Sequence, residues 1–116
     1  MIKYENAQDV KELAYQIISV LNDYFKHIDV ERIHFIRSRY SRSRAYARIH
    51  ALPRIWRTVL NLQPVYIIEV ISENYDLLSW EEKVKTIIHE LLHIPRCFTG
   101  GLRTHGLHVN EEIVNK

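Results

Sequence analysis

The sequence of 116 residues predicts an α+β fold, in which an N-terminal helix packs on a small three-stranded sheet and a second helix follows the sheet. Three observations predict this class: an apolar stripe at helical spacing near the N-terminus, short β-rich segments in the middle, and a capped amphipathic segment at residues 79–94. A composition of 47% hydrophobic and 26% charged residues is typical of a globular chain. No repeat or linker divides residues 1–116, so we expect a single domain.

The N-terminal helix is expected over residues 7–28. Its apolar residues recur at steps of three and four, which places them on one face of a helix. Asn6 is suited to cap the N-terminus, and Asp9 lies in the first turn, where the helix dipole favours an acid. We expect the helix to be structural. Its apolar face consists of Val10, Leu13, Ala14, Ile17, Ile18, Leu21, Tyr24, Phe25 and Ile28.

Three strands are expected between the two helices. Residues 65–71 are β-branched on both faces and give the strongest strand signal, whereas residues 32–40 lose their alternation after Ile36. Residues 44–51 alternate, and their small apolar face is expected to lie against the first helix. Residues 55–62 are expected to form a short helix or a loop. The alternating strand carries Ala45, Ala47, Ile49 and Ala51 on one face and Arg44, Tyr46, Arg48 and His50 on the other.

The charge is unevenly distributed, although the net charge is only +2. Eight arginines lie between residues 32 and 57, and no acidic residue occurs between Glu31 and Glu69. Such polarity can attract an anionic partner, of which nucleic acid is the obvious candidate, or it can simply face water. The candidate contacts to nucleic acid are Arg37, Arg39, Arg42, Arg44 and Arg48.

The second helix has a clear start and end. Ser79 and Glu82 form a capping-box pattern in which each side chain can accept from the other residue's backbone N–H. Pro95 ends the helix, because proline removes a backbone donor and clashes with the preceding turn. The expected buried side consists of Trp80, Val84, Ile87, Ile88, Leu91 and Leu92.

This helix contains the motif His89-Glu90-Leu91-Leu92-His93, an instance of H-E-x-x-H. Histidines four residues apart project from one face of a helix, so both imidazoles can reach one metal ion. Zinc suits such ligands and lowers the pKa of its water to about 7. Glu90 is expected to act as general base and then to protonate the leaving amine. The alternative is a pair of exposed histidines on a surface helix.

A catalytic zinc site usually takes a third protein ligand. Two more histidines, His105 and His108, lie downstream, and His105 is the first choice because it follows His93 after a glycine-containing loop. His108 is the alternative, and Glu111 and Glu112 are weaker candidates. All the glycines of the chain fall in this region, which favours a loop that turns back. They are Gly100, Gly101 and Gly106.

The run His-Glu-Leu-Leu-His-Ile-Pro from residue 89, Gly-Gly-Leu-Arg from residue 100 and His-Gly from residue 105 resembles small predicted metallopeptidases of the phage and archaeal type. These are similar to the SprT-like (Spartan-type) zinc proteases. The resemblance implies a minimal zincin-like fold, a third ligand from the His-Gly element at His105, and a cleft lined by residues 65–71, which would pair with an extended peptide. It also implies protein substrates that are associated with DNA.

The leading hypothesis is a zinc-dependent metallopeptidase that acts on a peptide or protein substrate. The alternative is a non-catalytic, zinc-containing module that binds nucleic acid through residues 32–57, and a small metal-dependent nuclease is a weaker option. The single cysteine, Cys97, fits a reducing compartment, and no apolar run is long enough to span a membrane. We therefore expect a cytoplasmic location and no contact with a membrane. The sequence does not indicate the oligomeric state.

Overall fold

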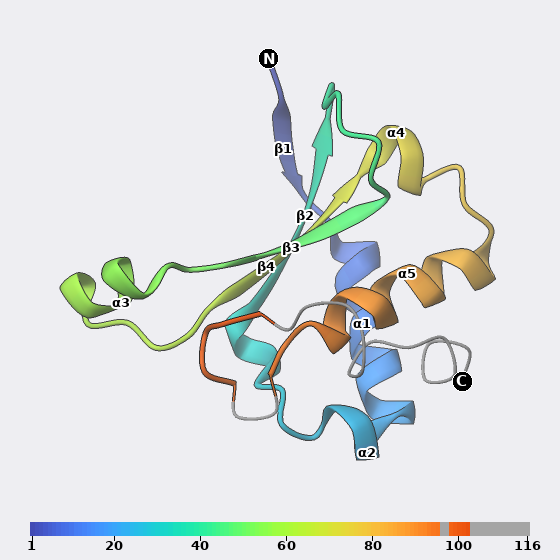
Figure 1. The fold of residues 1–116 in the computed structure, drawn as a ribbon. Helices are drawn as coiled ribbons and strands as arrows, with labels where there is room; N and C mark the ends of the chain where they lie inside the picture. Colours follow the sequence, from blue (N-terminus) through green and yellow to red (C-terminus); the bar gives the residue numbers. More distant parts are fainter. Residues whose placement is uncertain (96–97, 103–116) are drawn as a thin grey trace.

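The computed structural model describes residues 1–95 and 98–102. This part of the chain forms a four-stranded mixed sheet with five α-helices, which confirms the α+β class (Figure 1). Within it, no helix is long and apolar enough to cross a membrane. The elements in chain order are β1 (Lys3–Asn6), α1 (Gln8–Val20), α2 (Asn22–Phe25), a 3₁₀ turn (Val30–Arg32), β2 (Ile33–Arg39), β3 (Ala47–Ala51), α3 (Arg54–Leu60), β4 (Tyr66–Ile71), α4 (Ser72–Tyr75) and α5 (Trp80–Leu92).

The strands lie in the order β1-β2-β4-β3. β4 is parallel to β2 and antiparallel to β3, so that Ile68 faces Phe35 on one side and Ile49 on the other. β1 is antiparallel to β2. β4 is therefore an internal strand, and β1 and β3 form the two edges of the sheet.

The fourth strand, β1, is the reason that the expected three-stranded sheet is wrong. Its sequence, Lys-Tyr-Glu-Asn, has neither alternation nor β-branched residues that would indicate a strand. Asn6 ends this strand and does not cap the helix. Ala7 occupies the N-cap position instead, and its N–H donates to the carbonyl oxygen of Phe35 at 3.1 Å.

The N-terminal helix is shorter than expected, because it breaks at Leu21. Leu21 has φ −102° and ψ 39°, and its N–H still donates to the carbonyl oxygen of Ile17 at 2.8 Å. α2 follows immediately, and Phe25 and Ile28 are buried beyond the break. The apolar stripe is thus real, but two helices share it.

β3 starts later than expected, at Ala47. In the preceding segment the N–H of Ser43 donates to the hydroxyl of Ser41, and the N–H of Ala45 donates to the hydroxyl of Ser43. These local bonds compete with strand pairing. The expected partner of β3 is the first helix, but β3 packs chiefly against α5, whereas α1 packs chiefly against β2 and α5. The ambiguous segment after Pro53 forms a helix, α3.

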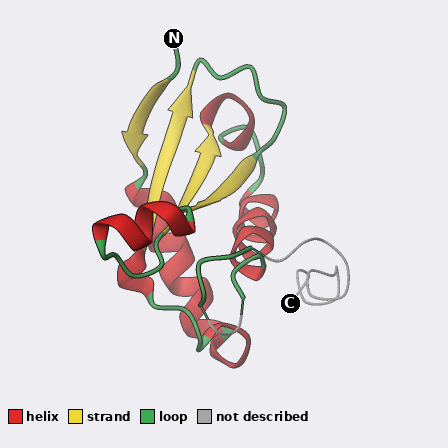
Figure 2. Cartoon of the chain, turned by 60° about the vertical axis from the view of Figure 1, so that its left-hand side comes forward, coloured by secondary structure: helices red, strands yellow, loops and turns green. Residues whose placement is uncertain are grey.

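The core lies between the sheet and the two long helices, α1 and α5, which pack against each other (Figure 2). Alternation along β4 divides its side chains between this covered face and the opposite face of the sheet. The opposite face bears a concavity of about 380 Å³, which Ile36, Ile67 and Glu69 line from the sheet. The covered face of the core includes Val10, Leu13 and Ile17 of α1, Ile33 and Phe35 of β2, Tyr66, Ile68 and Val70 of β4, and Ile87, Ile88 and Leu91 of α5.

The capping box of α5 forms as predicted. The N–H of Glu82 donates to the hydroxyl of Ser79 at 3.2 Å, and the N–H of Ser79 donates to the carboxylate of Glu82 at 3.2 Å. At the other end, the ring nitrogen of His27 donates to the carbonyl oxygen of Ile94 at 3.2 Å. Both ends of the helix that carries the H-E-x-x-H motif are therefore fixed by hydrogen bonds.

Candidate metal centre

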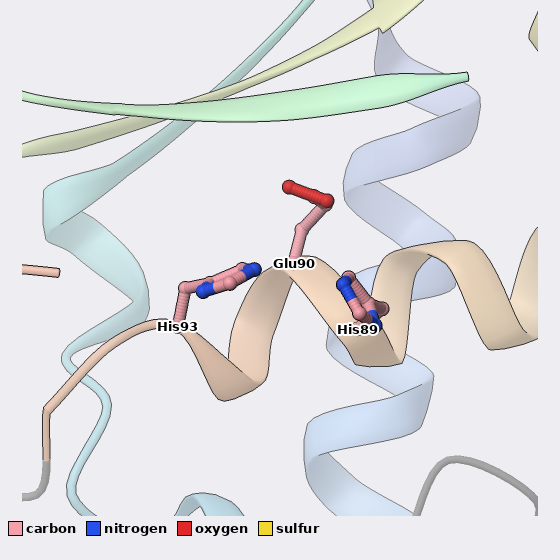
Figure 3. Close-up of side chains that lie close together, drawn as sticks. All are labelled: His89, Glu90 and His93. Atoms are coloured by element: carbon pink, nitrogen blue, oxygen red, sulfur yellow. The ribbon is translucent and has the colours of Figure 1, made fainter. Parts of the chain in front are cut away.

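The last turn of α5 brings His89, Glu90 and His93 together (Figure 3). Each offers one ligand atom, and these atoms lie within 4.8 Å of one another. The two imidazole rings are 5.2 Å apart between centroids and nearly perpendicular, at 79°. Two imidazole nitrogens and a carboxylate oxygen are donors that zinc accepts. The cluster therefore has side chains that can hold a metal ion, and the helical spacing places both imidazoles in reach of it.

The cluster lies at the boundary between core and solvent. Glu90 is 7% exposed and His93 is 8% exposed, whereas His89 is half-buried. Burial penalises the ionised carboxylate and raises the pKa of Glu90 to about 7. A carboxyl group with this pKa can both accept and release a proton near neutral pH, which is the property that a general base and acid needs.

β3 lies next to this site. It contacts α5, and the strand crosses the helix on the side toward which Glu90 points (Figure 3). Since β3 is an edge strand, one row of its backbone N–H and C=O groups has no partner strand in the described part of the sheet. This row can pair with an extended segment.

The expectation that residues 65–71 pair with a peptide is wrong. β4 occupies these residues, and both of its edges are already paired, with β2 and with β3. The residue pattern explains why β4 is an internal strand, because a strand that is apolar on both faces is typical of the interior of a sheet.

Residues 98–102, which follow α5, contact β4, and the return of this loop towards the metal site stays a prediction. The N–H of Gly100 donates to the hydroxyl of Tyr66, which in turn donates to the carbonyl oxygen of Gly101, both at 2.9 Å. Gly100 has φ 95°, and a Cβ there would lie 2.7 Å from the guanidinium carbon of Arg57. No pattern in the sequence indicates this role of Tyr66. The expected third ligands, His105 and His108, lie outside the described residues, as do Cys97, Glu111 and Glu112.

Three of the five arginines that were expected to contact nucleic acid form ion pairs within the chain. Arg42 and Arg44, by contrast, are exposed in the segment that connects β2 to β3. Acidic partners therefore neutralise part of the positive charge that the sequence shows in this region. The paired arginines are Arg37 with Asp9 and Asp76, Arg39 with Glu5, and Arg48 with Glu69.

Glu69 forms a buried ionic cluster that sequence reasoning missed. Arg48 donates to its carboxylate at 2.9 Å, and Nε2 of His50 lies 2.8 Å from the same oxygen, Oε1. Burial alone would raise the pKa of Glu69, but its hydrogen bonds outweigh this effect and lower the pKa to about 2. The sequence does contain a signal for this cluster. Glu69 is the single acid of an apolar strand, and Arg48 and His50 lie on one face of another strand.

The Glu69 cluster should make the protein less stable in acid. Because the folded pKa is about 2 and the ordinary value is 4.5, the contribution is present above pH 4.5 and is lost as the pH falls toward 2. We expect a loss on the order of 3 kcal/mol in the free energy of unfolding. Urea unfolding of the wild type and Glu69→Gln at several pH values checks this. A difference between the two proteins that does not change with pH would contradict it.

A family profile described as "Putative phage metallopeptidase" matches residues 2–116. No curated protein and no solved structure matches the chain significantly. The match covers nearly the whole chain, and it agrees with a candidate metal-binding triad on α5. The chain therefore belongs to the phage metallopeptidase family.

Proposed function

We propose that the protein is a zinc-dependent endopeptidase. The observation that carries the proposal is the convergence of His89, Glu90 and His93 on one turn of a helix, beneath an edge strand. The membership of a metallopeptidase family supports the same reaction class. A peptide or protein is the corresponding substrate.

In this proposal His89 and His93 bind the zinc ion, and His105 is the third ligand, with His108 as the alternative. When bound, zinc supplies a Lewis acid and a water whose pKa is lowered to about 7. Glu90 is placed next to the two imidazoles, so its carboxylate takes a proton from the attacking water and delivers it to the leaving amine. The low exposure of Glu90 keeps bulk water away from this proton transfer.

The substrate backbone pairs with the free edge of β3. Such β-augmentation fixes a peptide by main-chain hydrogen bonds and is tolerant of sequence. Ala47, Ile49 and Ala51 pack against the core, so their backbone is held in place. In this arrangement the peptide lies beside β3 and presents its scissile bond to Glu90 of α5, the helix that β3 contacts.

Removal of the metal tests the proposal directly. We expect a chelator to abolish the cleavage of an unfolded protein such as casein, and one equivalent of zinc to restore it. Cleavage is measured by gel electrophoresis, and zinc by atomic absorption of the purified protein. Undiminished cleavage after complete removal of zinc would overturn the assignment.

A second proposal, that the substrates are associated with DNA, rests on the exposed Arg42 and Arg44. If it holds, the wild type binds duplex DNA with an affinity that falls as salt increases, and Arg42→Ala/Arg44→Ala has a shallower salt dependence. The matched control is Arg54→Ala, an exposed arginine on α3. Binding that is absent, or that is identical in all three proteins, would contradict this second proposal.

A further inference from the structure

α3 exposes its apolar side to solvent. Ile55, Trp56, Val59 and Leu60 lie on one side of this short helix, since they are spaced one and four residues apart. Their exposed fractions lie between 53% and 76%. A helix of a globular protein normally turns such a face to the core. An exposed apolar face of this kind is typical of a surface that binds a protein, a membrane or a ligand.

The polar side of α3 faces the body of the protein. Arg57 is half-buried, and its guanidinium lies so close to Gly100 that a side chain at this glycine would collide with it. Gly100 is in turn hydrogen-bonded to Tyr66 of β4. The loop that follows the active-site helix therefore contacts α3, which fixes the inner side of α3 and leaves its apolar side outward.

α3 follows β3, the strand next to the site, after only a short connection. β3 ends at Ala51, and α3 begins at Arg54. Figure 1 shows α3 standing clear of the sheet at the end of two extended segments. A peptide that is paired along β3 and extends past its C-terminal end therefore arrives at α3. At the base of these segments, Leu52, Pro53 and Val65 line the concavity of about 380 Å³, so that apolar surface continues there.

The segment that contains α3 carries only positive charge, and its exposed arginine is Arg54. Arg54 and Arg57 are the only charged residues between residues 52 and 65. The Nε of Arg57 is buried and has no hydrogen-bond partner within the described residues. An occupant that complements this surface has apolar side chains and acidic neighbours.

We propose that the apolar face of α3 is an exosite that binds an apolar, acid-flanked segment of the protein substrate, outside the residues that surround the scissile bond. The inference rests on the proposed peptidase function, because the occupant of α3 is part of the same substrate that pairs with β3. It assigns substrate preference to a surface that holds no catalytic residue. Nucleic acid fits this surface poorly, since four large apolar side chains would face phosphates with two arginines nearby.

Three fluorogenic peptides with the same cleavage sequence test the exosite. Each end is extended in turn with an apolar, acid-flanked segment, and the reference peptide carries Gly-Ser extensions. For the wild type we expect the apolar extension at one end to improve kcat/KM by about tenfold, mainly through KM. In Trp56→Ala/Val59→Ala this preference should disappear, while the reference peptide is cleaved at an unchanged rate. The matched control is Val20→Ala/Leu77→Ala, whose apolar side chains are 81% and 85% exposed.

Binding of the same peptides to the Glu90→Gln variant, followed by fluorescence anisotropy, separates the exosite from the peptidase function. If no peptide is cleaved by the wild type but the apolar peptide binds more tightly and Trp56→Ala/Val59→Ala weakens it, the exosite stands and the peptidase proposal fails. Equal kcat/KM for all three peptides, together with equal binding, overturns the exosite. So does attachment to phosphatidylglycerol vesicles that requires Trp56 and occurs without any peptide preference, because the face would then be a membrane contact.

Discussion

In the Glu90→Gln variant we expect peptide hydrolysis to fall by about 10²–10⁴-fold while the bound zinc is retained. The amide of glutamine has nearly the same size as the carboxylate but cannot accept the proton of the attacking water. Because glutamine is neutral and of nearly the same size, the change should keep the packing of this almost completely buried position. The measurement is the initial rate on an unfolded protein substrate, together with the zinc content of the same preparation.

The matched control for this variant is Glu81→Gln. Glu81 lies on the same helix, but its side chain is 80% exposed and forms only a surface ion pair with Lys85. We expect its rate to equal that of the wild type. A normal rate in Glu90→Gln would show that this carboxylate moves no proton in the reaction.

The second large effect is expected in His93→Ala, which should lose both zinc and activity. Even the hydrogen-bonding partners of metal ligands contribute about 10–100-fold to metal affinity, so the loss of a ligand should cost more than about 100-fold. His93 is nearly buried. Among the described residues, the only cluster that could hold a metal ion contains His93 and His89 as its two histidines. Zinc affinity is measured by competition with a chromophoric chelator.

His34→Ala serves as the control, because His34 is exposed on β2 and lies outside the cluster. It should bind zinc as the wild type does. The same measurement on His105→Ala and His108→Ala identifies the third ligand. If His93→Ala binds zinc with unchanged affinity, the ion is not held by α5.

Local patterns predicted the elements whose signals are strong over several residues. The β-branched run gives β4, and the capping box with its apolar spacing gives α5. β1 could not be predicted, because a polar strand of four residues is stabilised by its pairing with β2 and not by its own composition. The position of β4 between β2 and β3 is also a tertiary property, and this is why the peptide-binding edge was assigned to the wrong strand.

The site itself was more predictable than its surroundings. The spacing of His89 and His93 fixes their common face through helix geometry alone, and the structure brings them together with Glu90. The arginines were misjudged for the opposite reason. Their acidic partners lie far away in sequence, as Arg37 with Asp76 illustrates, so that a count of charges along the chain does not show which of them are neutralised.

The internal position of β4 also determines when the active site can exist. β2 and β3 both precede β4 along the chain, yet they are joined only after β4 has entered between them. Long-range pairing of this kind is slow compared with the formation of local helices. α5 follows β4 and packs against α1 and β3, so we expect its histidines to reach their final positions late in folding. If the protein is the peptidase proposed above, we therefore expect a newly made chain to cleave nothing until its own sheet has formed, which would protect both the chain and its neighbours from premature cleavage.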